Sequence, residues 1–334
     1  MSANSQSTPA RMPAARQPKR IGIVGCGAVA RQFHASAIKA FPHLRPVGVS
    51  DLNPDLARDL GAQLGCPAMP YAALLENTDF VAITTPPASH SSLVKTALDA
   101  GVHVIVEKPF VARVAEAIDL IERATKAGRG LFVAQLRRFA SAPTLARQLV
   151  EAGAVGTVTG LEVYEGGRFS WDTASGYVHK DRHGGVIFDT GSHSLDLGLF
   201  VTGLDSQPMS ITLETVVKDK PEPAHEVRAD FLLHGNLGQV TARLVLSRYE
   251  PLANLIRVRG DRGQLELGIG FGDTVRLKTS AGRVLVRPPG PPRTFHQCFA
   301  AQYASILEAP ATSPTRAQLV VNQIMILEQV HAHA

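Results

Sequence analysis

The chain has 334 residues, 45% of them hydrophobic and 19% charged, which is typical of a soluble globular protein large enough for two domains. The net charge of +5 includes four cations in a first segment that has no acidic residue: Arg11, Arg16, Lys19 and Arg20. The rest of the chain therefore carries only about +1, which argues against nucleic acid as the main partner. No apolar run is long enough to span a membrane, so no membrane partner is expected.

Residues 1–20 lack the apolar core of a secretory signal, and we predict a disordered tail there. Their basic, acid-free composition leaves an organellar transit peptide open, but the cytoplasm is the favoured compartment. The cysteines Cys26, Cys66 and Cys298 are widely separated and form no C-x-x-C pair. Neither a disulfide framework nor a thiolate zinc site is therefore indicated.

A strand, a glycine turn and a helix are expected at the start of the folded part. Ile21 to Val24 is a short apolar run, and the sequence GCGAVA follows it directly at residues 25–30. In a dinucleotide-binding turn, Gly25 would permit the tight bend, Gly27 would let the backbone approach a pyrophosphate, and Ala30 would let the helix pack closely on the strand. Such turns also occur for packing alone. The N–H groups of the turn and the helix dipole would hold the phosphates, and we assign four residues to cofactor binding: Gly25, Gly27, Ala28 and Val29.

Asp51 follows a predicted second strand, Val47 to Ser50, and lies 21 residues after Ala30, with the loop Pro42 to Pro46 accounting for the spacing. This is near the expected place of a ribose-binding carboxylate. A carboxylate can accept hydrogen bonds from both ribose hydroxyls but repels a 2′-phosphate. The cofactor is therefore predicted to be NAD rather than NADP.

Further strand–helix units follow in order: a helix from about Pro54 to Gly65, the strand Phe80 to Ile83, a helix from about Ser91 to Ala100, a strand containing Val104, and a helix with Val114, Ile118 and Ile121. We expect Leu131 to Ala134 to be the sixth strand of a six-stranded Rossmann domain over residues 21–138. The segment TTPPASH, at residues 84–90, would follow the fourth strand and lie along the nicotinamide half of the cofactor. We assign Thr85, Pro86 and His90 to cofactor binding, with the alternative that His90 makes only local hydrogen bonds at a helix start.

The segment Gly101 to Phe110 delivers an ionisable pair, Glu107 and Lys108, to the end of an apolar strand, just before Pro109. In doubly wound sheets, ligands bind beyond the carboxyl ends of the strands. Lys108 would therefore project toward whatever the sheet binds, and both Glu107 and Lys108 are assigned to the cofactor site. The alternative is a solvated loop lysine.

Beyond a helix at about Ala142 to Glu151, apolar residues alternate with polar ones, which predicts an open, mainly antiparallel sheet within a C-terminal α/β domain over residues 139–334. Examples of alternating runs are Ile211, Leu213, Thr215 and Val217, and Val227, Ala229, Phe231 and Leu233. We expect the uncovered face to be partly apolar, including Val216, Leu232 and Val245, and to join copies into a homodimer or homotetramer.

Asp189 and His193 are four residues apart, and Asp196 follows three residues later. On a helix this spacing places all three on one face. A carboxylate beside an imidazole makes a general base, because the acid orients the ring and favours its charged form. The alternative is a helix whose polar groups bond locally. His179 and His183 are also four residues apart, but no H-E-x-x-H or cysteine pair supports a metal, and none is predicted.

These motifs together resemble those of the glucose-fructose oxidoreductase and inositol dehydrogenase family, called Gfo/Idh/MocA. The resemblance covers residues 21 to about 331 and rests on GCGAVA at 25–30, TPPASH at 85–90, AGVHVIVEKP at 100–109 and GGVIFDTGSHSLD at 184–196. It implies a Rossmann domain, a C-terminal α/β domain built on an open sheet, and a nicotinamide cofactor between them. It also implies oxidation or reduction of a carbon of a sugar, cyclitol or nucleotide sugar. By motif matching, the family's active-site lysine, acid and histidine are Lys108, Asp189 and His193.

One departure from the family concerns the segment after the last Rossmann strand, where Leu136 and Arg137 precede Arg138 and Phe139 although many relatives have Asn before the Arg-Phe pair. By position, the candidate substrate contacts are Arg138, Arg168, Trp171 and Tyr177. The alternative function is a catalytically silent NAD(P)-binding regulator. Such a protein should have lost Lys108, Asp189 or His193, and all three are present.

Overall fold

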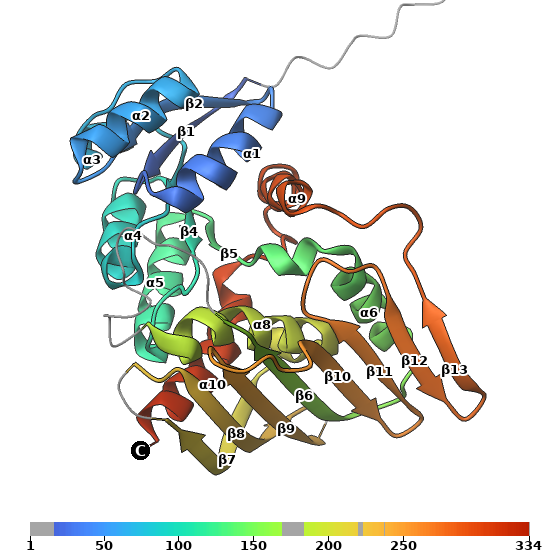
Figure 1. Ribbon diagram of the computed structural model, residues 1–334. Helices are drawn as coiled ribbons and strands as arrows, with labels where there is room; N and C mark the ends of the chain where they lie inside the picture. The colour runs from blue at the N-terminus through green and yellow to red at the C-terminus, as the bar shows by residue number, and fades with distance from the viewer. Residues whose placement is uncertain (1–16, 169–183, 220–222, 237, 334) are drawn as a thin grey trace, which may run out of the picture.

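A computed structural model describes residues 17–168, 184–219, 223–236 and 238–333. Within these ranges the chain forms two sheets with helices packed on them (Figure 1). The first sheet contains β1 (Lys19–Val24), β2 (Leu44–Ser50), β3 (Phe80–Ile83), β4 (His103–Glu107) and β5 (Leu131–Ala134). The strand order is β2-β1-β3-β4-β5 and every pairing is parallel. The doubly wound fold expected from the sequence is confirmed.

Two details of the predicted Rossmann unit are wrong. The sheet has five strands among the described residues, not six, so the segment 84–90 follows the third strand. After Ala134 the chain turns through the short 3₁₀ helix Leu136–Phe139 into α6 (Ser141–Glu151) and adds no further strand. The second strand also begins at Leu44, so the predicted loop Pro42 to Pro46 is largely strand. Pro46 is tolerated there because β2 is an edge strand. On such a strand, a residue without an N–H can face away from the neighbouring strand.

Helices cover both faces of the first sheet: α1 (Ala35–Ala40), α2 (Pro54–Leu64), α3 (Tyr71–Glu76), α4 (His90–Asp99) and α5 (Val114–Ala127). Ile105 of β4 packs in the cluster that contains α1 and α2 residues, whereas Val104 and Val106 pack in the cluster that contains α4 and α5 residues. Because both faces are buried, the strand is apolar at successive positions instead of alternating.

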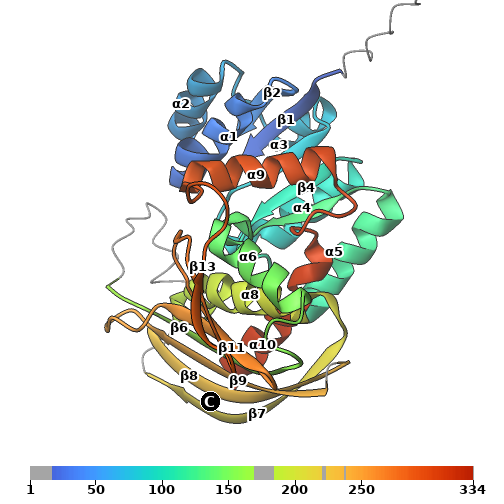
Figure 2. The same ribbon diagram turned by 90° about the vertical axis from the view of Figure 1, so that its right-hand side faces the viewer.

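The second sheet contains β6 (Val158–Gly166), β7 (Met209–Lys218), β8 (Glu226–Gly235), β9 (Gly238–Ser247), β10 (Leu255–Gly260), β11 (Gly263–Gly268), β12 (Val275–Thr279) and β13 (Gly282–Val286). Its order is β13-β12-β11-β10-β6-β9-β8-β7, and every pairing is antiparallel except β6 with β9. The helices α6, α8 (Gly191–Thr202) and α10 (Val321–Ala332) pack on one face (Figures 1 and 2). The open, mainly antiparallel sheet is therefore confirmed.

The opposite face of this sheet is more charged than the sequence predicted. A register shift between Leu213 and Thr215 reverses the alternation in β7, and Val216 consequently packs on the helix-covered core. Its assignment to the open face is wrong. Ion pairs join neighbouring strands, among them Arg243 with Asp230, Arg257 with Glu162, Arg257 with Glu266, and Arg259 with Glu162.

Helix α9 (Phe295–Glu308) returns from the second sheet to the first and lies beside α1 in both views (Figures 1 and 2). Its start is fixed by a capping box between Thr294 and Gln297. Phe295, Phe299 and Tyr303 share one helix face, where Phe299 stacks on Phe33 and Tyr303 reaches His34. A late segment of the chain thus completes the packing around the glycine turn. No helix of the described residues is long and apolar enough to cross a membrane.

Candidate active site

The glycine turn at the end of β1 has the conformation that a dinucleotide phosphate site needs. Gly25 has φ +91°, and a Cβ there would lie 2.6 Å from the backbone N of Thr85. A Cβ at Gly27, by contrast, would meet no atom within 4 Å, so the backbone there borders open space. Ala30 is fully buried at the start of the π-helical turn Ala30–His34 that leads into α1. The turn therefore fits the phosphates of a dinucleotide.

Asp51 lies directly beyond β2 and beside this turn. One carboxylate oxygen accepts a hydrogen bond from the Cys26 backbone N–H at 2.5 Å, and the other accepts from Asn53 N–H at 2.7 Å. Each oxygen can accept a further bond.

Burial and the nearby Asp51 charge raise the pKa of the Cys26 thiol to about 12, which makes Cys26 a neutral packing residue. Arg58 is paired with Asp55 on α2, at 2.5 Å.

His90 does not fit the predicted direct contact with the cofactor. Its side chain is fully buried, and its Nδ1 lies 3.0 Å from the Pro109 carbonyl oxygen and 3.1 Å from that of Phe110. Its Nε2 lies 2.9 Å from the carbonyl oxygen of Thr85. Burial lowers the pKa of the ring. His90 instead joins the 84–90 loop to the segment after Lys108, so the alternative of local hydrogen bonding describes it better.

Lys108 and Asp189 meet beyond the carboxyl ends of the first sheet's strands. Lys108 Nζ donates to Asp189 Oδ1 at 2.8 Å, and both side chains are 14% exposed. The other oxygen of Asp189 accepts from Arg248 Nη2 at 2.8 Å, and the same nitrogen donates to the Gly185 carbonyl at 2.9 Å. Asp189 lies on a π-helical turn, Val186–Thr190, that leads into α8. Arg248 follows β9 directly, and no sequence motif marked it.

His193 lies one helical turn beyond Asp189 but does not bond to it. Both Asp189 oxygens face cations, and His193 Nδ1 is buried without a hydrogen-bond partner among the described residues. Burial, followed by the positive charges of Lys108 and Arg137, lowers the pKa of His193 well below its ordinary value. The prediction that Asp189 orients this ring and favours its charged form is therefore wrong. His193 is neutral near pH 7, which is the form that a general base requires.

Arg138 cannot contact a substrate as predicted, because its side chain has no exposed surface. It donates to both oxygens of Asp196, at 2.8 and 2.6 Å, and to Asp205 at 2.7 Å. Two further bonds reach the carbonyls of Pro314 and Leu319. Both oxygens of Asp196 are therefore occupied by Arg138, which joins the end of the first sheet to α8.

A second ion pair lies near His193. Arg137 donates to both oxygens of Glu165, at 2.8 and 2.9 Å, and Ser194 Oγ donates to the same carboxylate. The Arg137 and Glu165 side chains are 21% and 19% exposed. Sequence reasoning missed this pair because β6 and the segment after β5 meet only in the fold. Arg168 is exposed two residues after β6, and its substrate role stays a prediction.

Several sequence assignments lie outside the described residues, namely those for Trp171 and Tyr177 and the spacing of His179 and His183. No group of three His, Cys, Asp or Glu residues in the described part of the chain is arranged to hold a metal.

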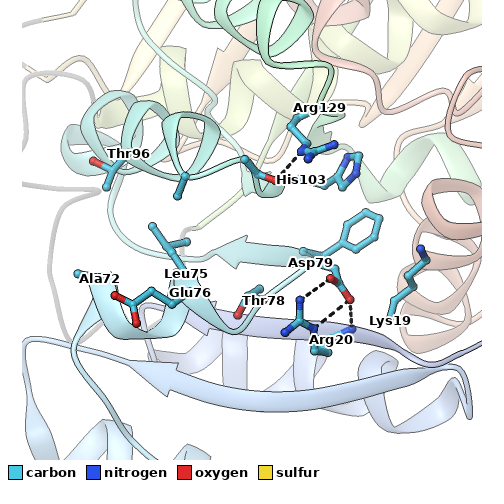
Figure 3. A pocket seen from close by; sticks show the side chains of 13 residues that line it. Lys19, Arg20, Ala72, Leu75, Glu76, Thr78, Asp79, Thr96, His103 and Arg129 are labelled. Carbon is cyan, nitrogen blue, oxygen red and sulfur yellow. Dashed lines mark hydrogen bonds and ion pairs between the residues drawn. The ribbon is translucent and has the colours of Figure 1, made fainter.

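A separate hollow of about 720 Å³ lies at the opposite, amino-terminal edge of the first sheet (Figure 3). Its charged groups include Arg20, which is paired with Asp79, and Arg129, which bonds to the Gly101 carbonyl. Ligands of doubly wound sheets bind at the carboxyl edge. The cluster around Lys108 is therefore the better candidate site.

Two family models match the chain: the oxidoreductase family with an NAD-binding Rossmann fold over residues 19–135, and the GFO/IDH/MocA C-terminal domain over residues 144–266. The chain belongs to the Gfo/Idh/MocA family. The resemblance inferred from the four motifs is confirmed.

Two curated relatives of this Gfo/Idh/MocA chain are named for reactions of nucleotide-linked sugars. The chain is 36% identical over 192 residues to dTDP-3,4-didehydro-2,6-dideoxy-alpha-D-glucose 3-reductase of Streptomyces violaceoruber. The aligned region covers 55% of this chain and 54% of the relative. The chain is also 32% identical over 206 residues to UDP-N-acetylglucosamine 3-dehydrogenase of Acidithiobacillus ferrooxidans. This aligned region covers 61% of each of the two chains. The chain thus matches only a little over half the length of these relatives.

Solved Gfo/Idh/MocA-like structures show the same fold over nearly the whole chain. A 3-ketoreductase from Actinomadura kijaniata in complex with NADP has a TM-score of 0.76 at 20% identity, covering 93% of this chain and 96% of the other. An oxidoreductase from Agrobacterium radiobacter in complex with NAD⁺ has a TM-score of 0.76 at 21% identity, covering 95% and 97%. One neighbour contains NADP and the other NAD⁺, so the neighbours do not choose between the cofactors.

Proposed function

We propose that the protein is an NAD(P)-dependent oxidoreductase that interconverts an alcohol and a ketone on a sugar, cyclitol or nucleotide sugar. The observation that carries this proposal is the placement of Lys108, which is bound to Asp189 and accompanied by a neutral His193. These residues lie at the carboxyl edge of a sheet whose glycine turn fits a dinucleotide. The family to which the chain belongs supports the same chemistry.

The nicotinamide, when bound, supplies the hydride acceptor or donor. In the oxidation direction, neutral His193 would take the proton of the reacting hydroxyl group. Lys108 Nζ would donate a hydrogen bond to the same oxygen and stabilise its developing negative charge. Asp189, fixed by Arg248 on its other oxygen, would hold Lys108 in place. This gives Asp189 the role of positioning the lysine instead of the histidine.

NAD is the proposed cofactor, with NADP less favoured. Asp51 lies beside the glycine turn and keeps lone pairs that could accept hydrogen bonds from ribose hydroxyls. A 2′-phosphate about 4 Å from this carboxylate would be repelled by roughly 4 kcal/mol at an effective dielectric of 20. Arg58 of α2 forms only an exposed pair with Asp55, and it could offset this repulsion if it turned to the phosphate.

The proposed substrate class is a sugar, and nucleotide sugars are the first to test because the two curated relatives are named for them. The decisive experiment is to follow the absorbance of reduced cofactor while purified protein is mixed with NAD and a panel of sugars, cyclitols and nucleotide sugars. We expect turnover with at least one member. Tight NAD binding without turnover of any member, in either direction, would favour the silent regulator.

Self-association is also proposed, through the face of the second sheet opposite α6, α8 and α10, which the helices of the described residues leave open. Leu232 and Val245 are partly buried on this face among the ion pairs that link its strands. A second copy could cover this surface in a symmetric dimer. Light scattering at micromolar concentration should show a dimer or tetramer, and a monomer would contradict this part of the proposal.

A further inference from the structure

A fully buried histidine connects the glycine turn to the segment that carries Lys108. His34, the last residue of the π-helical turn after Ala30, has no exposed surface. Its Nδ1 lies 2.8 Å from the hydroxyl of Tyr303, and its Nε2 lies 2.9 Å from Glu107 Oε1. The other oxygen of Glu107 accepts the backbone N–H of Lys108 at 3.2 Å. The contacts thus run without interruption from α9 to Lys108.

The chemistry of Tyr303 and Glu107 limits which atoms can donate in this hydrogen-bonded network. Burial raises the pKa of Tyr303, so its phenol keeps its proton, and His34 Nδ1 is the partner found for it among the described residues. At the other end, an ionised carboxylate can only accept. His34 Nε2 therefore carries a proton and donates it to Glu107. Its Nδ1 shares a hydrogen bond with the Tyr303 hydroxyl.

Packing alone does not account for this arrangement. An apolar side chain would fill the space between Tyr303 and Glu107 without the cost of burying polar groups. Instead, three polar groups from three distant parts of the chain are bonded to one another, and the network ends on the residue beside Lys108. The sequence indicated Glu107 as a cofactor contact, but its carboxylate is turned to His34 and to the main chain of Lys108.

We infer that His34 is a positioning residue for Lys108. His34 is held by Tyr303 and fixes the Glu107 carboxylate. That carboxylate holds the main chain of Lys108, so that Lys108 Nζ meets Asp189 in one geometry. Lys108 is thus held at both ends, by Glu107 at its backbone and by Asp189 at its side chain. The kinetic part of this inference rests on the proposed function, in which Lys108 acts on the reacting oxygen. Misplacing such a group by about 1 Å can cost about 10² in rate.

The kinetic test compares variants of His34 and Tyr303 with a matched control on α9. H34L should lower kcat by about 10- to 100-fold with NAD affinity within about threefold. H34Q should recover most of the loss, because its amide can donate to Glu107 near the position of Nε2. Y303F, which removes only the hydroxyl, should lower kcat by about three- to tenfold. F299L removes a ring that packs edge-on against His34 and leaves the hydrogen bonds in place. It should lower the melting temperature without lowering kcat.

Two measurements test the inference without any substrate. In protein labelled with ¹⁵N-histidine, the His34 signal should show a proton on Nε2, and a ring whose Nε2 carries no proton would overturn the hydrogen bond to Glu107. Amide hydrogen exchange at Lys108 should quicken by about tenfold or more in H34L but not in F299L. Equal exchange in the two variants, or equal effects of Y303F and F299L on kcat, would reduce His34 to a packing residue. Failure to find any substrate would count against the proposed function and leave these two results decisive here.

Discussion

The carboxylate of Asp189 lies between Lys108 and Arg248 and contacts each cation at 2.8 Å. Lys108 is 81 residues away along the chain and Arg248 is 59 residues away, so the fold alone brings the three together. Two cations fix the position of this carboxylate, which suits the task of holding a lysine in place.

Arg248 should matter for turnover although no sequence motif marks it. R248M would remove two charge-assisted hydrogen bonds, each typically worth about 1.5–3 kcal/mol, and would take one of the two cations from Asp189. We expect a lower melting temperature and a kcat reduced about tenfold or more, with unchanged NAD affinity. The matched control is R243M, which breaks a pair with Asp230 on the open face of the same strand, β9. Equal kcat in the two variants would show that Asp189 does not need Arg248.

Asp51 should set the cofactor preference. D51N keeps the size of the side chain and an oxygen that can accept the Cys26 N–H, but it removes the negative charge. Because that charge opposes a 2′-phosphate by up to roughly 4 kcal/mol, the ratio of the NADP to the NAD dissociation constant should fall by about tenfold or more. Titrating both cofactors by fluorescence checks this. A ratio that is the same in both proteins would remove Asp51 from the ribose site.

The pH dependence of oxidation should follow His193. Burial and the charges of Lys108 and Arg137 lower its pKa well below 6.5, so the neutral form persists as the pH falls through 6.5. Since a general base acts in its neutral form, the acidic limb of the kcat profile should have its midpoint below 6.5. A midpoint at or above 6.5 would show that His193 is not the base, or that substrate binding reverses the shift.

Arg138 should contribute to stability and not to substrate binding. R138M would leave Asp196 and Asp205 buried without their main cation, and breaking such a buried pair typically costs about 3–5 kcal/mol. The denaturant midpoint should fall strongly, while the KM of the remaining folded protein stays unchanged. R58M, which removes an exposed arginine paired with an exposed aspartate, is the control and should leave the midpoint where it is. A raised KM at wild-type stability would restore Arg138 as a substrate contact.

The sequence predicted those features that depend on local patterns. The apolar runs of the first sheet, the glycine turn and the Lys108 motif are contiguous segments, and their places in the fold follow from general rules of doubly wound sheets. The meeting of Lys108 with Asp189 was implied only by the family's motifs. Their separation along the chain hides it from any local reading.

The features that were missed depend on tertiary contacts. Arg248 and the pair of Arg137 with Glu165 join elements that are neighbours only in the folded chain. Arg138 was assigned to the substrate by its position after the last Rossmann strand, but four distant groups satisfy it in the interior. Val216 was assigned to the wrong face because one extra residue in β7 reverses the alternation, which a period of two cannot show.

The most direct test of the account is the turnover of K108A measured alongside its affinity for NAD. One donor aimed at a developing oxyanion is worth roughly 2.7–4 kcal/mol, so kcat should fall by about 10² to 10³ while the NAD dissociation constant changes little. H193A should fall by a comparable amount, and the double variant should lose less than the product of the two, because both residues act on one proton transfer. An unchanged kcat in K108A, or a loss explained wholly by weaker NAD binding, would contradict the account.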